Sequence, residues 1–140
     1  MKLSAKTRYA VRLIFTLAGA GEPVPIAILS EKTGLSPRTV EQVHGVLKSH
    51  GITDAQVGAR GGLVLLRPVK DIRLGSLVEC FDKGVELSVC CGEKSQDCPR
   101  RHKCGARAAW AALSLDVQRL LDEVALADLA DNGQEWGISK

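Results

Sequence analysis

The fold is decided by residues 25–51, which read PIAILSEKTGLSPRTVEQVHGVLKSHG. Pro25 can open a short helix that Gly34 closes, and Ser36 followed by Pro37 is typical of a second helix with a capping side chain and a proline in its first turn. Apolar side chains recur on one face of this second helix until the glycine that ends the stretch. Two short helices joined by a tight turn predict a helix-turn-helix.

The second helix exposes polar side chains at its start that can reach base edges or phosphates in a major groove. They are Arg38, Thr39, Glu41 and Gln42. Residues 52–57 and 63–66 then read as two short strands around Gly58-Ala59-Arg60-Gly61-Gly62, a wing with an arginine at its tip. Arg38 or Arg60 alone could be an ordinary solvated side chain, but their placement on a helix-turn-helix and its wing favours DNA binding.

Further helices are expected on both sides of this module. One begins after its cap, Ser4, and another covers residues 74–81. The longest runs from 106 to about 129, where apolar residues recur at steps of 3, 4, 3 and 4, as in a heptad seam. The seam residues are Trp110, Leu113, Val117, Leu120 and Val124. A seam can pack against its own chain, but a small winged module offers little partner surface, so we expect a homodimer that reads an inverted-repeat operator.

Together these patterns predict a mainly α protein with a small β wing. We expect a winged helix-turn-helix DNA-binding region over residues 1–83, a cysteine-rich loop over 84–104, a dimerisation helix over 105–131 and a C-terminal tail over 132–140.

Composition narrows the class of protein. The 140 residues are enough for one domain with its own core. Charges at positions 2, 6 and 8 leave no room for the apolar run of a signal peptide, and no stretch approaches the roughly 20 apolar residues of a membrane span. We therefore expect a cytoplasmic protein without a membrane partner and without a catalytic role. Residues 1–73 hold 11 Lys and Arg against 5 Asp and Glu, which favours this half for contact with a polyanion.

Residues 90–104, CCGEKSQDCPRRHKC, hold four of the five cysteines in a stretch with no helical or strand period. In a reducing compartment this favours metal or redox chemistry over disulfides. Soft thiolates select zinc, cuprous copper or iron-sulfur clusters, and the tight pairs of structural zinc modules are missing. The wide spacings favour an iron-sulfur cluster, although ordinary thiols or a disulfide pair in a surface loop remain the simpler alternative. Cys80, in an apolar helical context, is expected to be a core residue.

With these residues in place, the chain resembles the Rrf2 family of winged-helix transcription regulators, which includes IscR, NsrR, RirA and CymR. The resemblance covers nearly the whole chain. Its markers are residues 1–11, Leu35-Ser36 with Glu41-Gln42, the wing glycines and the cysteine loop before the long helix. The resemblance implies DNA contacts from the positions that match the family's DNA-binding surface: Lys6, Arg8, Tyr9, Ser36, Arg38, Thr39, Glu41, Gln42, Arg60 and Gly61.

The same resemblance implies a 2Fe-2S or 4Fe-4S cluster whose presence or state changes the affinity for DNA. Its ligands would be Cys98, Cys104 and one of Cys90 or Cys91. We favour Cys91, because its spacing is closer to that of the family, because Gly92 lets the loop turn, and because adjacent side chains of an extended loop point to opposite sides.

The family's fourth ligands are not present in this chain. Arg107 stands where IscR-like members have a histidine, and Arg8 where NsrR-like members have an acid. The open choices are the spare cysteine, His102, Glu86 or Glu93. The family's recognition aromatic, pre-wing arginine and wing tyrosine are replaced by Thr39, Gly58 and Val64, which leaves the operator sequence open.

Three functions of different classes follow. The leading one is a dimeric DNA-binding repressor or dual regulator, controlled by an iron-sulfur cluster that senses iron, cluster status, redox state or nitric oxide. A cluster-free thiol regulator or a zinc-containing regulator of the same fold is the alternative. An iron-sulfur electron-transfer protein is the third, and it has no use for a helix-turn-helix with a basic wing.

Overall fold

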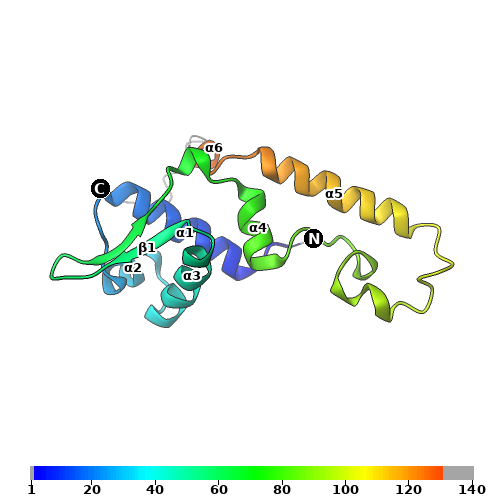
Figure 1. Ribbon diagram of the computed structural model, residues 1–140, viewed down its shortest axis with the longest axis horizontal. Helices are drawn as coiled ribbons and strands as arrows, with labels where there is room; N and C mark the ends of the chain where they lie inside the picture. Colours follow the sequence, from blue (N-terminus) through cyan, green and yellow to red (C-terminus); the bar gives the residue numbers. More distant parts are fainter. Residues whose placement is uncertain (1, 131–140) are drawn as a thin grey trace.

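The computed structural model describes residues 2–130, and Figure 1 shows their arrangement. The helices are α1 (Ala5–Ala20), α2 (Ile26–Thr33), α3 (Pro37–Ser49), α4 (Leu74–Asp82), α5 (Arg107–Glu123) and α6 (Leu126–Ala130). Two strands, β1 (Thr53–Gln56) and β2 (Gly62–Leu65), and three 3-10 helices, η1 (Val69–Asp71), η2 (Val89–Cys91) and η3 (Glu93–Asp97), complete the chain. The mainly α fold with a small β wing is confirmed.

Local capping chemistry explains where the helices of the winged module begin and end. The Ser4 and Ser36 side chains accept hydrogen bonds from the backbone N–H groups three residues later, at 3.2 and 3.1 Å. Pro37 occupies the first position of α3, where a missing N–H costs nothing. Gly34 ends α2 in the left-handed conformation with φ 69°, as the turn between α2 and α3 requires.

The wing is an antiparallel hairpin in which Thr53 lies opposite Leu65 and Gln56 opposite Gly62. Val24 adds a single-residue β-bridge to the hairpin: its N–H donates to the Leu63 carbonyl at 3.0 Å, and its carbonyl accepts from the Leu63 N–H at 2.8 Å. Glycine is required at position 62 beside this bridge, since a side chain there would collide with the Val24 backbone. The wing glycines permit positive φ, and within residues 58–62 Gly58 adopts it, at 130°.

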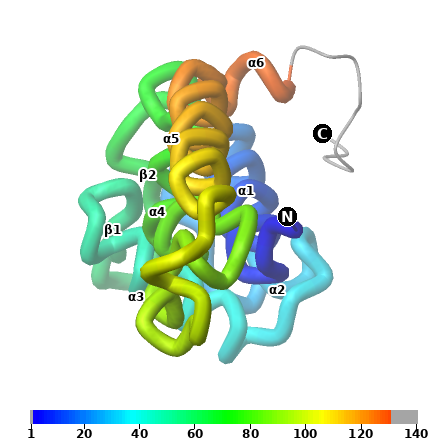
Figure 2. The backbone as a smooth tube through the Cα atoms, turned by 90° about the vertical axis from the view of Figure 1, so that its right-hand side faces the viewer, coloured from blue at the N-terminus to red at the C-terminus, as the bar shows by residue number. Residues whose placement is uncertain are grey.

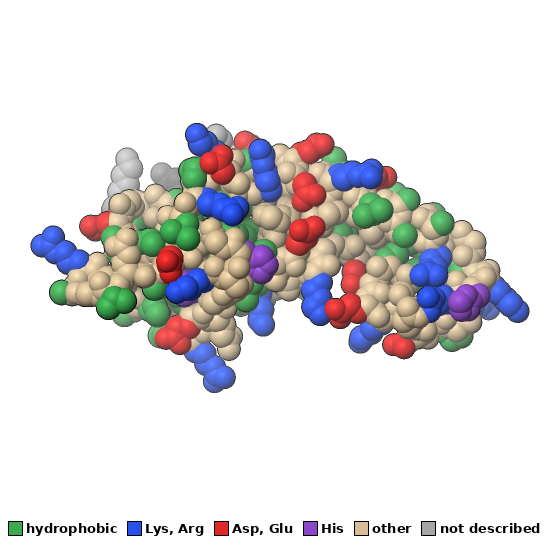
Figure 3. Space-filling model, in the orientation of Figure 1, with side chains coloured by type: hydrophobic (Ala, Val, Ile, Leu, Met, Phe, Trp, Pro, Cys, Tyr) green, Lys and Arg blue, Asp and Glu red, His purple; other side chains and the backbone are tan. Residues whose placement is uncertain are grey.

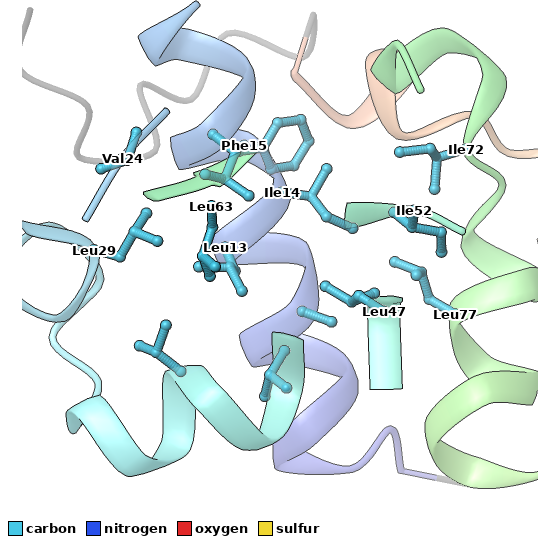
Figure 4. Close-up of a cluster of buried hydrophobic side chains, with 14 of the residues drawn as sticks. Leu13, Ile14, Phe15, Val24, Leu29, Leu47, Ile52, Leu63, Ile72 and Leu77 are labelled. Atoms are coloured by element: carbon cyan, nitrogen blue, oxygen red, sulfur yellow. The ribbon is translucent and has the colours of Figure 1, made fainter. Parts of the chain in front are cut away.

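The core lies between α1, α3, α4 and the wing (Figure 4). Its fully buried side chains come from elements far apart in the sequence, including Leu13 of α1, Leu47 of α3 and Leu77 of α4. Leu126 of α6 is also fully buried in this core. The C-terminal end of the described chain therefore packs against the winged module.

The expectation of a single helix from 106 to about 129 is wrong at Val124 and Ala125, which interrupt it and divide it into α5 and α6. α5 ends at Glu123, and Val124 is extended with φ −81° and ψ 112°. The backbone then pairs with the residues at the start of α4 and just before it: the Leu74 N–H donates to the Val124 carbonyl and the Leu126 N–H to the Ile72 carbonyl, both at 2.9 Å. Because this pairing and the burial of Leu126 outweigh another helical turn, Val124 leaves the seam.

The molecule is elongated, with the wing at one end and the cysteine-rich stretch at the other (Figure 1). α5 extends away from the winged module, and Figure 2 looks along it. We call residues 84–104 the cysteine segment. It lies beyond the end of α4 and leads into α5. The expected tail over 132–140 lies outside the described residues, and among residues 2–130 no helix is long and apolar enough to cross a membrane.

Candidate nucleic-acid interface and cysteine segment

The start of α3 presents the polar side chains that the sequence singles out. Arg38, Glu41 and Gln42 are exposed, and no hydrogen bond or ion pair engages them within residues 2–130. Ser36 and Thr39 are committed to the cap instead, with their hydroxyl oxygens 2.8 Å apart. Three side chains on α3 are therefore free to meet a partner, and two hold the helix start in place.

The wing and α1 supply the remaining predicted residues. Arg60 is exposed at the wing tip, and the Gly61 N–H closes the tip turn on the Gly58 carbonyl at 3.0 Å. Lys6 and Arg8 are exposed on the first turn of α1. Tyr9 is half-buried, with the Arg12 guanidinium carbon 6.0 Å from its ring centroid.

One contact between α3 and the wing is not predicted from the sequence. His44 Nδ1 lies 3.0 Å from the hydroxyl of the buried Thr53 and so joins the middle of α3 to β1. Burial, followed by the charge of Lys48, lowers the pKa of His44, and Asp54 opposes this. The Lys48 ammonium binds the Asp54 carboxylate at 3.0 Å, and both groups are exposed. A lone histidine on a helix gives no local sign of such a bond, so the sequence could not indicate it.

The cysteine segment is divided into a fastened half and an outer half. Up to Glu93 it is held by the helices: the Leu87 N–H donates to the Ser114 hydroxyl of α5 at 3.3 Å, and Lys83 binds Glu93 at 2.6 Å. From Cys98 to Cys104 the recorded backbone bonds are local turns, such as the Arg101 N–H to the Cys98 carbonyl at 3.1 Å.

The four cysteines of the segment do not gather at one site: Cys90 and Cys91 contact each other, but Cys98 and Cys104 lie apart from them. Cys91 lines an open pocket of about 600 Å³ between α4 and α5, whereas Cys98 is half-buried and Cys104 exposed on the outer half. Within residues 2–130 no group of three or more His, Cys, Asp or Glu side chains is placed to hold a metal ion. Thiolates are the usual ligands of iron-sulfur clusters, so the donor type fits such a group. The backbone hydrogen bonds of the outer half join residues only three positions apart.

Cys90 and Cys91 do not lie in the extended loop that the sequence predicts. Residues 89–91 form η2, a 3-10 helix, in which adjacent side chains do not alternate between two faces, so the prediction that only one of the two can face a common site loses its basis. The Cys90 thiol lies 3.3 Å from the Ser88 hydroxyl, and this bond lowers the pKa of Cys90.

The other thiol and carboxylate candidates have defined surroundings. Cys80 is half-buried on α4 rather than fully in the core, and burial raises its pKa, as does the charge of Glu79 to a smaller extent. His102 is exposed on the outer half. Glu93 is engaged by Lys83, whereas the exposed Glu86 carboxylate lies directly against Gly92 and would have to move aside for a larger residue there.

The outer half is also strongly basic. Arg100, Arg101 and Lys103 of the outer half, and Arg107 at the start of α5, make no ion pair with any described residue, and Figure 3 shows Lys, Arg and His side chains gathered at this end of the molecule. The Nε of Arg101 is buried without a hydrogen-bond partner among residues 2–130.

α5 packs one side against α4 and leaves apolar side chains uncovered on another. Ser114 is buried and donates to the Trp110 carbonyl at 2.8 Å. Trp110, Leu113 and Leu120 are 44%, 47% and 63% exposed. Three of the five predicted seam residues therefore form an open apolar face, Val117 is half-buried beside it, and Val124 lies outside the helix.

Comparison with known proteins identifies the family. A family model described as an iron-dependent transcriptional regulator, Rrf2, matches residues 3–132. The protein rrf2 of Nitratidesulfovibrio vulgaris is 32% identical over 131 residues, which are 92% of this chain and 87% of that protein. IscR of Sodalis glossinidius, an HTH-type transcriptional regulator, is 32% identical over 135 residues, covering 94% and 80% of the two chains.

Solved structures agree with these relatives. IscR of T. potens superposes with a TM-score of 0.71 at 25% identity and covers 100% of this chain and 93% of its own. CymR of B. subtilis, titled a global cysteine regulator, has a TM-score of 0.72 at 24% identity with coverage of 96% and 99%, and supports the fold. The winged module, the cysteine segment and the matches to known regulators together place this chain in the Rrf2 family of DNA-binding transcriptional regulators.

Proposed function

We propose that this protein is a homodimeric, cytoplasmic repressor whose affinity for an inverted-repeat operator is controlled by an iron-sulfur cluster on the cysteine segment. The observation that carries the proposal is the position of this segment. It begins at the end of α4, which packs in the core of the DNA-binding module, and it ends at α5, which carries the open apolar face. A change in the conformational order of the cysteine segment would therefore affect both the DNA-binding module and the open face of α5.

The DNA-binding surface comprises the start of α3, the wing tip and the first turn of α1. Arg38, Glu41 and Gln42 would reach base edges in the major groove, since they are exposed and unengaged within the described chain. Arg60, with Gly61 beside it, would follow the groove next to them. Lys6, Arg8 and Tyr9 would contact phosphates, which set register rather than sequence.

Ser36 and Thr39 would contribute to DNA binding indirectly, because their hydroxyls cap α3 and so hold the start of this helix at a defined angle. A capping serine can still present its own backbone N–H to a phosphate.

The open face of α5 is proposed as the dimer seam. Leu113 and Leu120 lie seven residues apart and so on one side of the helix, with Trp110 and Val117 beside them. A two-fold pairing through this face presents two winged modules to two half-sites.

The cluster would be held by Cys98, Cys104 and one of Cys91 or Cys90. When bound, it supplies an iron- and redox-dependent charge and a cross-link between the halves of the segment. The chain's own part is to bring thiolates together: the outer half must fold back toward the fastened half, against the mutual repulsion of its cationic side chains. The fourth ligand is then the spare cysteine, Glu86 or His102, since Glu93 is engaged by Lys83.

A cluster-free thiol regulator is the second candidate, and two observations favour it. The thiols do not converge within residues 2–130, and a CymR structure from Staphylococcus aureus, titled an oxidized form, is 25% identical with a TM-score of 0.69. In that case the cysteine segment would respond by thiol oxidation rather than by cluster loss.

Anaerobic purification with an absorption spectrum and analysis of iron and acid-labile sulfide separates the two candidates. The proposal expects a brown protein with stoichiometric iron and sulfide. Cys98→Ser and Cys104→Ser should each abolish the colour, and Cys80→Ser should retain it as the matched control. A colourless protein with zinc or with free thiols supports the second candidate instead.

A further inference from the structure

The end of α4 fastens the first turn of α1. Asp82 is the last residue of α4, and its Oδ2 accepts the Thr7 hydroxyl at 2.7 Å and the Ser4 N–H at 3.2 Å. The Ser4 hydroxyl caps α1 by accepting the Thr7 N–H at 3.2 Å. Thr7 is fully buried and Asp82 is half-buried, so this bond is partly shielded from water. One carboxylate thus holds both the cap and the first turn of a helix 75 residues away in sequence.

The next residue fastens the cysteine segment. Lys83 adopts the left-handed conformation, with φ 59°, and its ammonium binds the Glu93 carboxylate at 2.6 Å. Glu93 opens η3, which lies between Cys91 and Cys98. Two successive residues, Asp82 and Lys83, therefore hold the start of α1 and the cysteine segment at a single point. We call this point the α4 joint.

Lys6 and Arg8 connect the α4 joint to DNA binding. They flank the buried Thr7 and are exposed on the turn that Asp82 holds. Their contact with phosphates is part of the proposed function, on which this inference rests. Phosphate contacts require charges at fixed positions along the duplex, so a small rotation of this turn moves two of them together.

We propose that Asp82 and Thr7 are positioning residues for DNA binding, and that the cysteine segment acts on them through the Lys83–Glu93 pair. A rearrangement of the segment that withdraws Glu93 frees Lys83 and loosens the end of α4. The first turn of α1 then loses its fixed place against the core, and the affinity for DNA changes.

A double-mutant cycle tests this inference. Thr7→Val removes the hydroxyl donor at nearly constant volume, Thr7→Ser keeps it, and Glu93→Gln breaks the ion pair. The affinity of the full-length dimer is measured by fluorescence anisotropy with a duplex that the wild-type protein selects from a random-sequence pool. The cycle is run on protein as purified and again after removal of iron. The coupling between the two substitutions can therefore be measured even if no cluster binds.

The expected results distinguish a positioning role in DNA binding from a purely structural role. Thr7→Val weakens binding by about fivefold or more and makes the salt dependence shallower, since a part-buried bond to a charged acceptor is lost and Lys6 and Arg8 no longer meet phosphates. Thr7→Ser restores both. Glu93→Gln changes affinity by roughly two- to fivefold in the wild type, because the ion pair is exposed, and by a smaller factor in Thr7→Val.

Two results overturn the inference. One is a folded Thr7→Val protein with wild-type affinity and salt slope. The other is a Glu93→Gln effect that is the same in both backgrounds, which would limit Asp82 and Thr7 to a structural role. If Thr7→Val does not fold, Asp82→Asn replaces it in the same cycle. Coupling between the two substitutions in iron-free protein would support the α4 joint whether or not a cluster binds. If the iron-loaded and iron-free forms also bound DNA equally well, control by a cluster would be rejected.

Discussion

Truncation of the open face of α5 tests the proposed dimer. Leu113 and Leu120 are 47% and 63% exposed in one chain. Replacing leucine by alanine removes about three methylene equivalents, worth about 0.8 kcal/mol each when they are buried. Only the exposed fraction becomes buried on pairing, which leaves about 1.1 kcal/mol for Leu113 and about 1.5 kcal/mol for Leu120.

Two-fold symmetry doubles the effect, because each protomer contributes both leucines. The double variant should therefore weaken the dimer by about 5 kcal/mol, or roughly three to four powers of ten in the dissociation constant. Sedimentation velocity over a range of concentrations measures this constant. Leu115→Ala is the matched control: Leu115 is 59% exposed but lies about 200° around the helix from Leu113, beside the pocket between α4 and α5.

The reasoning is refuted if the wild-type protein is a stable monomer at micromolar concentration. It is refuted equally if the control lowers the dimer affinity as much as the double variant does. Charged residues at both leucine positions should give monomers or insoluble protein, since two unpaired charges would be buried in the seam.

Three further predictions concern DNA binding and the response to pH. Arg60→Ala should reduce the slope of log affinity against log salt by about 1, and Arg38→Ala should cost about 1 to 3 kcal/mol in operator binding; two unchanged anisotropy titrations would remove this surface from the interface. Burial opposes ionisation of Asp82, but the hydrogen bonds from α1 hold its pKa below the ordinary value, so its contribution to stability is present above about pH 4 and lost as pH falls through the lower folded pKa. In urea unfolding, Asp82→Asn should be less stable than the wild type at pH 7 and approach it in acid, whereas a constant difference would contradict the assignment. The lowered pKa of His44 favours its neutral form, so stability should fall as pH drops from about 6.5 toward the folded pKa, and His44→Gln should lack this part of the loss.

Local sequence signals predict the winged module well. Ser4, Ser36, Pro37 and Gly34 act on backbone groups within a few residues, so their effects are readable without knowledge of the fold. The apolar stripe of α3 is similarly local. Helix starts, the turn and the hairpin follow from such signals, with shifts of one residue at strand ends.

Contacts between distant residues could not be predicted in this way. The end of α5 is set by pairing of Val124 and Leu126 with the backbone at the start of α4 and just before it, and nothing in the heptad pattern indicates it. The bond between Thr7 and Asp82 and the bond between His44 and Thr53 depend on tertiary packing for the same reason. The cysteines illustrate a further limit, because their pattern indicates the kind of donor but not whether the donors meet.

The central claim is that the cysteine segment sets the affinity for DNA through a bound cluster. The most direct test compares the operator affinity of iron-loaded and iron-free dimer, measured anaerobically at one salt concentration, with Cys98→Ser as the constitutively iron-free reference. We expect the two wild-type forms to differ by about tenfold or more, within the usual range of coupling between two sites, and the iron-free form to match Cys98→Ser. Equal affinity of the iron-loaded and iron-free forms would contradict the account and leave any bound cluster with a structural role only.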